Sequence, residues 1–485
     1  MNHQKSQALD AIDRNRELLC RVSDQLWEHP EVGFHEKYAA ELYCDTLEAL
    51  GFQVERNLAG IPTAFSGTYG NDGPVIGFLG EFDALPGLSQ VEAALEKIPA
   101  QESAPGHGCG HNLLGVGSLA AAVAVKQYLQ DNHLPGTVVF FGCPAEEGGS
   151  GKGFMARSGV FQQVDIAFSW HPGEVNSVST EGTMSNYQIC YHFRGVSAHA
   201  AMSPEQGRSA LDALELMNIG VQFLREHVPT DTRIHYAITD TGGSAPGTVQ
   251  PYAQAVYLLR AVHPQQLIDL YDRVNKIARG AAMMTDTTVE IEFIKACSNV
   301  VINTELNRLM QKNLEQVPPA GFDEADLEQA RRYQQTFPKG KTYYDSLVDE
   351  VEDPQMREEL QARADEPIHR VVMPLARERQ GFVSSDVGDV SWNCPVAQIN
   401  AATMPAGVPM HSWQMVAVGK TPMAKKGMLY AAKVMAASAI DALEDPEIIR
   451  RAKEELLRRT GGKTYQPPIP AESQPKIPRD LFQTP

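Results

Sequence analysis

Short apolar runs bounded by turn residues recur along the first part of the chain, and this pattern is typical of buried strands. They lie at 74–80, 136–142 and 164–170, and an Ala-rich stretch at 113–129 predicts a helix between the first two. Residues 36–50 carry apolar side chains at helical spacing and stop at Gly51, a helix C-cap signal. The alternation of strand and helix predicts an α/β fold whose mixed, largely parallel sheet is covered by helices.

The pattern changes at about residue 186. Strand-like and helical stretches then follow one another in the order 186–195, 209–227, 233–239, 254–262 and 267–282. This order predicts a compact α+β unit of the ferredoxin-like type, inserted into the first domain. We therefore divide the chain into 1–185, an insertion at 186–300, and 301–485, which ends in a Pro-rich tail beyond Gly461.

Composition narrows the kind of partner. The 485 residues are 43% hydrophobic and 21% charged, as in ordinary globular proteins, and the net charge of -18 favours neither nucleic acid nor an anionic membrane. A small-molecule partner fits better. The seven cysteines are scattered and odd in number, and the N-terminus lacks the apolar core of a secretory signal. We expect a cytoplasmic protein with free thiols and no membrane span.

Chemistry-bearing residues follow each of the three predicted strands. "GEFDALPGL" comes after the first, "CPAEEGGSGKG" after the second and "HPGE" after the third. Ligands of open α/β sheets bind outside the carboxyl ends of the strands, so these loops are expected to converge. The glycines of "GHGCGHN" permit tight backbone paths that bring Cys109 and His111 to one point.

Thiolate, imidazole and carboxylate groups are the ligands of borderline divalent metals. The candidates are Cys109, His111, Glu146, Glu147, His171 and His411. Each alone is better explained as a buried cysteine, a satisfied histidine or a solvated acid. Their arrangement favours a metal site, because the two acids follow a strand and precede two glycines. The residues themselves leave one metal or two open.

These motifs resemble the M20 metallopeptidases, and within them the amidohydrolase branch. The resemblance is carried by "GEFDALPGL", "GHGCGHN", "PAEEGGSGKG", "WHP", "GVSAHAA", "GRSALDA" and "MHSW", in family order over most of residues 20–440. It implies a dimetal aminopeptidase-like catalytic domain in two parts and identifies residues 186–300 as a lid or dimerisation domain. Such a domain implies a homodimer or a heterodimer with a paralogous subunit.

The resemblance also implies roles for single residues. Two divalent ions, Mn(II) or Zn(II), would be held by Cys109, His111, Glu147, His171 and His411. Glu146 would be the general base, and Asp83 would orient a metal-bound imidazole. His199 in the inserted domain would reach the site of the neighbouring subunit and stabilise the developing oxyanion.

The implied reaction is hydrolysis of the amide bond of an N-acyl amino acid, with an aryl acyl group and a glutamate leaving group as the specific expectation. Arg260 is a candidate to bind a substrate carboxylate, and a surface ion pair is its alternative. Trp413 is a candidate to stack on an aromatic ring, with a core position as its alternative. Gly247 stands where relatives of this branch would have Asn, which leaves one substrate contact unaccounted for.

Two other functions remain open. The first is an aminoacylase or a dipeptidase of the same fold, which differs in substrate. The second is a non-catalytic subunit that supports a paralogous hydrolase. An acid pair beside a ligand set argues against the second, because a scaffold needs neither.

Overall fold

The computed structural model describes residues 2–476, and its main sheet has seven strands. In spatial order these are β1 (Gln53–Arg56), β2 (Phe65–Tyr69), β4 (Thr137–Cys143), β3 (Val75–Glu81), β5 (Ile166–Gly173), β13 (Val396–Ala402) and β6 (Ser177–Val178). The four strands from β4 to β13 run parallel, whereas β1, β2 and β6 pair antiparallel with their neighbours. The predicted α/β fold with a mixed, largely parallel sheet is confirmed.

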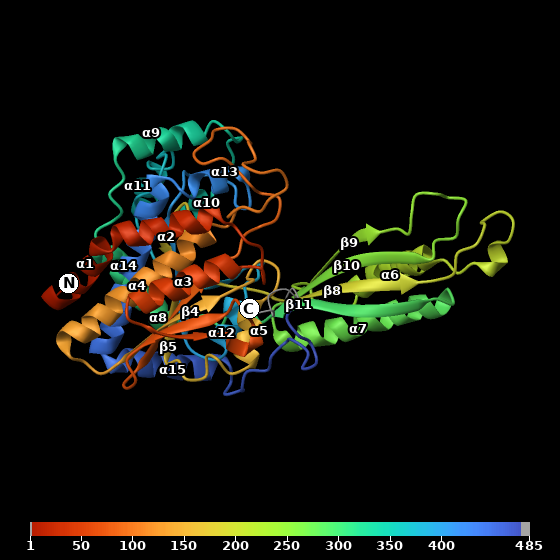
Figure 1. Cartoon of the computed structure of the whole chain (residues 1–485), viewed down its shortest axis with the longest axis horizontal. Coiled ribbons are helices and arrows are strands. Elements are labelled where there is room, and N and C mark those ends of the chain that lie inside the picture. Colours follow the sequence, from red (N-terminus) through yellow and green to blue (C-terminus); the bar gives the residue numbers. More distant parts are fainter. Residues whose placement is uncertain (1, 477–485) are drawn as a thin grey trace.

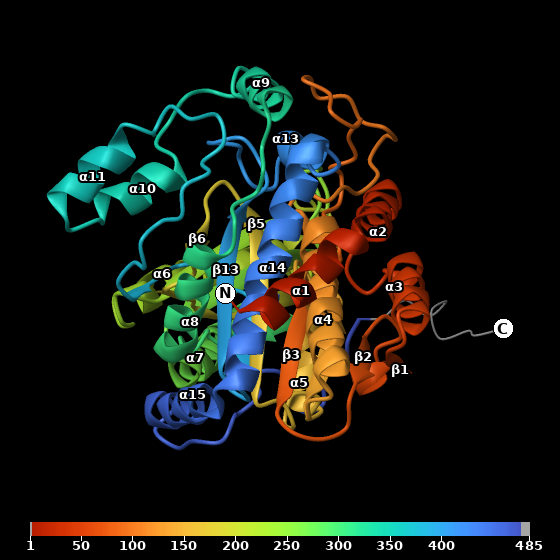
Figure 2. The same cartoon turned by 90° about the vertical axis from the view of Figure 1, so that its left-hand side faces the viewer.

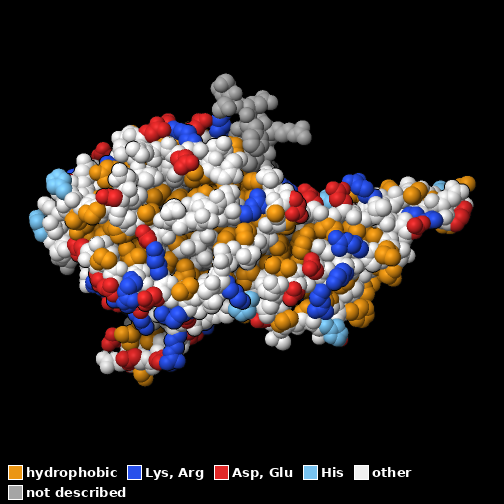
Figure 3. All heavy atoms as spheres, turned by 90° about the horizontal axis from the view of Figure 1, so that it is seen from below, with side chains coloured by type: hydrophobic (Ala, Val, Ile, Leu, Met, Phe, Trp, Pro, Cys, Tyr) orange, Lys and Arg blue, Asp and Glu red, His pale blue; other side chains and the backbone are white. Residues whose placement is uncertain are grey.

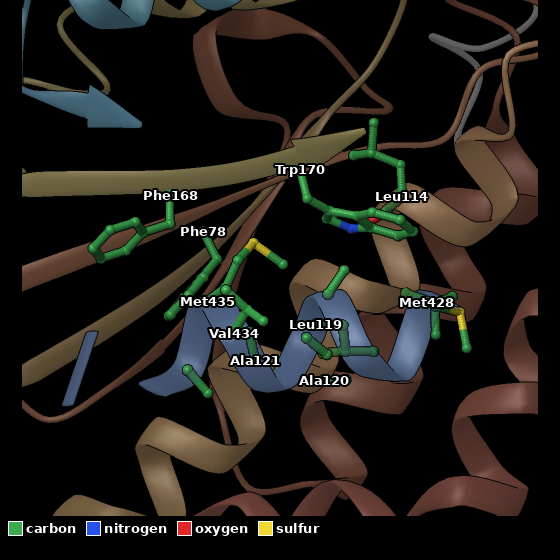
Figure 4. Close-up of a cluster of buried hydrophobic side chains, with 14 of the residues drawn as sticks. Phe78, Leu114, Leu119, Ala120, Ala121, Phe168, Trp170, Met428, Val434 and Met435 are labelled. Atoms are coloured by element: carbon green, nitrogen blue, oxygen red, sulfur yellow. The ribbon is translucent and has the colours of Figure 1, made fainter. Parts of the chain in front are cut away.

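Helices cover one face of this sheet. The helices that bury side chains on this face include α1 (His3–Arg14), α4 (His111–Asn132), α14 (Pro422–Glu444), α2 (Arg16–Glu28), α3 (Lys37–Ala49), α8 (Thr304–Gln316), α9 (Glu324–Tyr333) and α15 (Pro446–Arg459). Figure 2 shows α1, α4 and α14 lying across the sheet. The Ala-rich α4 is buried along almost its whole length, which explains why the sequence shows no polar stripe there. Figure 4 shows the side chains of this core that pack between the sheet, α4 and α14.

The opposite face of the sheet forms a second core. Along β3 and β4, Phe78 and Phe140 point to the first core while Leu79 and Phe141 point to the second. This alternation follows from the two-residue period of a strand. The second core also receives α5 (Gly151–Arg157) and α12 (Val387–Ser391), and it continues into the inserted unit.

The inserted unit projects from the body as an arm, and we call residues 185–297 the arm (Figure 1). Its elements are β8 (Ser185–Arg194), α6 (Ala210–Arg225), β9 (Arg233–Asp240), β10 (Tyr252–Ala261), α7 (Pro264–Met284) and β11 (Thr288–Cys297). The sheet order is β11-β8-β10-β9 with every pair antiparallel, which is the ferredoxin-like arrangement. Alternate residues of β10 are buried, because both helices pack on one face.

The rest of the chain completes the body. Its remaining elements are α10 (Tyr343–Asp349), α11 (Pro354–Gln361), α13 (Trp413–Val418) and the short strand pair β7 (Glu181–Gly182) and β12 (Arg379–Gln380). The helices α10 and α11 share a small core of their own. Residues 463–476 form neither helix nor strand and run past the junction of body and arm, where Ile469 is buried (Figure 1). Within residues 2–476, no helix is long and apolar enough to cross a membrane.

Candidate metal centre

The predicted loops converge at the carboxyl ends of the central strands. Glu81 is the last residue of β3, the pair Glu146 and Glu147 follows β4, and His171 lies near the end of β5. They line a cavity of about 760 Å³, which Cys109 and His411 also line. This is the position at which open α/β sheets bind ligands.

Cys109, His111 and His171 form one group of donor atoms within 4.8 Å of one another. His111 is the first residue of α4, and Gly110 before it adopts a φ of 76°, which a residue with a β-carbon rarely does. The Sγ of Cys109 lies 3.4 Å from Nε2 of His171. The Nδ1 of His171 lies 2.8 Å from the carbonyl oxygen of Pro172, so a ring proton at Nδ1 leaves Nε2 free as a ligand.

Cys109 belongs to a second group with Glu147 and His411. Nε2 of His411 lies 3.5 Å from Oε1 of Glu147. The backbone N–H of His411 donates to the carbonyl of Gly108, which ties this late loop to the loop that carries Cys109. His411 is the outermost of these side chains, since 53% of it is exposed.

The donor set fits a divalent ion better than it fits a hydrogen-bond network. Oε1 of Glu147 and Nε2 of His111 are buried and make no hydrogen bond within residues 2–476. Buried polar atoms without partners are rare, so each needs an explanation. Donor atoms 3.3 to 3.5 Å apart match ligands about 2.0–2.3 Å from one tetrahedral ion, which lie about 3.3–3.7 Å from each other. Thiolate, imidazole and carboxylate together suit a borderline metal.

Asp83 does not line the cavity, but it contacts two of the candidate ligands. Its Oδ1 lies 2.9 Å from Nδ1 of His111, and its Oδ2 accepts a hydrogen bond from the backbone N–H of Glu147 at 2.9 Å. Burial by itself raises the pKa of Asp83, but the hydrogen bond and charge of His111 outweigh it, so the pKa lies below its usual value. An ionised Asp83 fixes the His111 proton on Nδ1 and turns Nε2 to the cluster.

A strained turn presents the acid pair to the cavity. Ala145 adopts a φ of 57°, which is uncommon for a residue with a β-carbon. Its N–H donates to the buried carboxylate of Glu36, which fixes the turn. Burial raises the pKa of Glu146, and the negative charge of Glu81 raises it further. Burial likewise raises the pKa of Glu147 to about 7.

The remaining candidates lie outside the cavity. His199 is on the segment 195–209, which joins β8 to α6 at the outer end of the arm (Figure 1), and its Nδ1 accepts hydrogen bonds from the N–H groups of Ala201 and Met202. Nη1 of Arg260 donates to Oγ of Ser384 at 2.7 Å, and Ser384 lines the cavity. Trp413 begins α13 and packs, half-buried, against the first core. The structure thus brings the five expected ligands together with Glu146 and Asp83, but it leaves His199 and Trp413 apart from them.

Sequence reasoning missed three charged residues next to the cluster. Lys152, on the first turn of α5, has no exposed surface and lies 2.7 Å from both Glu81 and Asp386. The other oxygen of Glu81 lies 3.3 Å from Nε2 of His111. The available signal for a buried lysine was its sequence context: Lys152 stands between two glycines, just before the apolar residues "FMA", where a side chain has little room to reach solvent.

The sequence of the chain is similar to those of known proteins. The profile of peptidase family M20/M25/M40 matches residues 77–341. The chain is 42% identical to the B subunit of p-aminobenzoyl-glutamate hydrolase from Escherichia coli (strain K12) over 96% of this chain and 97% of that protein. It is 27% identical to the A subunit of the hydrolase from the same organism over 54% of this chain and 64% of that protein.

A solved structure shows the same fold. The Bacillus subtilis YXEP protein, described as a dinuclear metal binding peptidase from the M20 family, superposes with a TM-score of 0.57 at 15% identity. The match covers 89% of this chain and 99% of that one. The chain therefore shares its overall fold with a solved structure.

Proposed function

The chain belongs to peptidase family M20/M25/M40, and on that premise we propose that it is a metal-dependent hydrolase of the amide bond of N-acyl amino acids. The cluster of one cysteine, three histidines and three glutamates around the carboxyl ends of β3, β4 and β5 carries this proposal; its members are Cys109, His111, His171, His411, Glu81, Glu146 and Glu147. The cluster combines metal ligands with a further carboxylate inside a cavity large enough for a small-molecule substrate.

The specific substrate that we propose is p-aminobenzoyl-glutamate, which hydrolysis converts to p-aminobenzoate and glutamate. The 42% identity over nearly the full length of both chains supports this choice. Arg260 supports it as well, because its guanidinium reaches Ser384 at the cavity wall and suits a substrate carboxylate. Trp413 would need to move toward the cavity to stack on the aryl ring, so its role stays a prediction.

Two divalent ions, Mn(II) or Zn(II), would activate a water molecule and polarise the scissile carbonyl when bound by Cys109, His111, Glu147, His171 and His411. Glu146 then accepts a proton from the water and delivers it to the nitrogen of the leaving amine. Glu147 serves as a ligand, so its neighbour is left free for proton transfer. Asp83 keeps the His111 proton on Nδ1 throughout.

A panel of substrates tests the reaction. Protein stripped with a chelator and reloaded with Mn(II) or Zn(II) separately should release glutamate from p-aminobenzoyl-glutamate faster than amino acids from N-acetyl amino acids or dipeptides. Preference for either of the latter would identify an aminoacylase or a dipeptidase. No turnover by the isolated chain, restored by a paralogous subunit and unaffected by Glu146→Gln in this chain, would identify a non-catalytic partner.

We propose a dimer formed through the arm, with a second copy or a paralogous chain as the partner. The strand β9 is an edge of the arm sheet, and Ile219 and Phe223 of α6 are 53% and 67% exposed. Edge strands and exposed apolar side chains favour association. Figure 3 shows hydrophobic side chains along the arm, interspersed with charged ones. Two relatives are named as different subunits of one hydrolase, which supports a paralogous partner.

The dimer gives His199 a role, because its segment lies at the outer end of the arm, away from the cavity of its own chain. We propose that His199 completes the site of the other protomer. Glu146→Gln and His199→Ala dimers should each be nearly inactive, whereas mixing under exchange of protomers restores one intact site per mixed dimer. Random exchange makes half the dimers mixed, so activity should approach about a quarter of wild type. No recovery, with exchange verified by a mass tag, would refute the shared site.

A further inference from the structure

A buried ammonium group stands between the candidate metal centre and the second core. Nζ of Lys152 lies 2.7 Å from Oε1 of Glu81 and 2.7 Å from Oδ1 of Asp386, and no part of its side chain is exposed. The other oxygen of Asp386 accepts a hydrogen bond from the backbone N–H of Lys152. Asp386 therefore fixes both the lysine and the first turn of α5.

Glu81 connects this lysine to the cluster. One of its oxygens is held by Lys152, and the other lies 3.3 Å from Nε2 of His111. Glu81, His111 and Glu146 also place donor atoms within 4.8 Å of one another, and Glu81 lines the cavity. The orientation of the Glu81 carboxylate is thus determined on one side by the lysine, and it presents its free oxygen to the centre.

We propose that Lys152 is a positioning residue of the metal centre: it holds Glu81 so that this carboxylate faces His111 and Glu146 and strengthens the binding of a divalent ion there. The inference rests on the proposed function in one respect, namely that the cluster binds divalent metal. It adds a residue pair that the expected ligand set does not contain.

Lys152 also balances the negative charge of buried carboxylates at this site. The carboxylates packed around this corner of the cavity are Glu81, Asp83, Glu146, Glu147 and Asp386. A buried carboxylate without a counter-charge is strongly destabilised, and a buried ammonium is equally so. Lys152 compensates two of the acids in the protein without metal, so the site keeps its shape before an ion arrives.

Simple electrostatics and the positioning role predict opposite results for Lys152→Met. Removing a positive charge close to a divalent cation should, by Coulomb's law alone, tighten metal binding. If Lys152 acts by holding Glu81, its removal instead lets the carboxylate turn away and weakens binding. Loss of an outer partner of a metal ligand typically weakens metal affinity about 10- to 100-fold.

The experiment measures Mn(II) and Zn(II) affinity of chelator-stripped full-length protein by competition with a coloured chelator. Lys152→Met and Glu81→Gln should each bind metal about 10- to 100-fold more weakly, and the double variant should bind no more weakly than either single one. Tighter or unchanged binding by Lys152→Met, or additive losses in the double variant, would overturn the proposal. If Lys152→Met fails to fold, Glu81→Gln decides, since wild-type affinity there would overturn it too.

Lys5 provides the matched control. It is also a buried lysine, with Nζ 2.6 Å from Asp441 and 2.7 Å from Asn313, on the helix α1 that covers the other face of the sheet. Lys5→Met should lower the melting temperature and leave metal affinity unchanged. An equal loss of metal affinity in this variant would mean that the Lys152 effect is general destabilisation, and it would overturn the proposal. Wild-type protein that binds metal but hydrolyses no substrate would instead contradict the proposed function alone.

Discussion

Asp83→Asn is the substitution whose effect can be worked out most directly, because the side chain has two partners and both are donors. One oxygen of Asp83 accepts from Nδ1 of His111 and the other from the N–H of Glu147. Asparagine has one acceptor oxygen and one NH₂ group of nearly the same shape. Whichever way it is turned, its NH₂ meets an N–H of one of the two candidate ligands.

The cost falls mainly on the metal-bound state. Without metal, the His111 ring can move its proton to the other nitrogen or turn slightly, and so relieve the conflict. With metal, Nε2 must present its lone pair and Nδ1 must keep the proton. A buried donor without a partner costs about 1–3 kcal/mol. Since about 1.4 kcal/mol is tenfold in an equilibrium constant, Asp83→Asn should weaken metal binding roughly 5- to 150-fold.

Chelator competition on the stripped protein measures this loss of metal affinity directly. Thermal unfolding of the metal-free protein measures the effect of the substitution on stability. Asp389→Asn is the matched control: Asp389 is equally buried, but it accepts hydrogen bonds from Ser298 and Tyr465 instead of from candidate ligands. It should lower stability without changing metal affinity. Wild-type affinity in Asp83→Asn would refute the reasoning, because it would mean that neither ligand depends on Asp83.

Three further changes give separable outcomes. Glu146→Gln should keep its metal content and lose turnover by about 10² or more, the usual effect of losing a general acid or base; metal loss would show that the roles of the two adjacent glutamates are exchanged. Cys109→Ser should lower the occupancy of one metal in elemental analysis, because thiolate is the stronger ligand for zinc-like ions, and unchanged stoichiometry and activity would make the cysteine structural. Gly117→Ala would place a β-carbon 2.5 Å from the indole nitrogen of the buried Trp170. Overpacking should lower the free energy of unfolding by about 1–3 kcal/mol, less the roughly 0.5–1 kcal/mol gained in helix propensity; a more stable variant in urea unfolding would contradict it.

Local patterns were enough to predict the central sheet. The apolar run 136–142 corresponds to β4, Thr137–Cys143, because a strand buried on both faces has no polar positions to interrupt it. Once the strands were known, their carboxyl ends indicated where the acid pair and His171 would meet. The convergence of the acid pair and His171 was therefore predictable from strand ends without knowledge of side-chain contacts, whereas Cys109, His111 and His411 lie on segments that do not directly follow a strand.

Contacts between distant segments were not predictable in this way. Lys152 pairs with Asp386, 234 residues further along the chain, and nothing in either local sequence indicates the other. The position of Trp413 was equally open, since the same aromatic side chain suits a cavity wall or a core, and only packing decides. The role proposed for His199 requires a second protomer, which lies beyond the information in one folded chain.

The order of strands in the main sheet has a consequence for how the protein is made. β5 ends at Gly173 and pairs in parallel with β13, which begins only at Val396, after the whole arm. At about 5–20 residues per second, a ribosome needs roughly 10–45 s to deliver that partner. The arm is one continuous segment, so its four strands can pair with one another during this interval. The nascent body, by contrast, presents an open apolar strand edge until β13 emerges, and this is the stage at which a chaperone would be of most use to it.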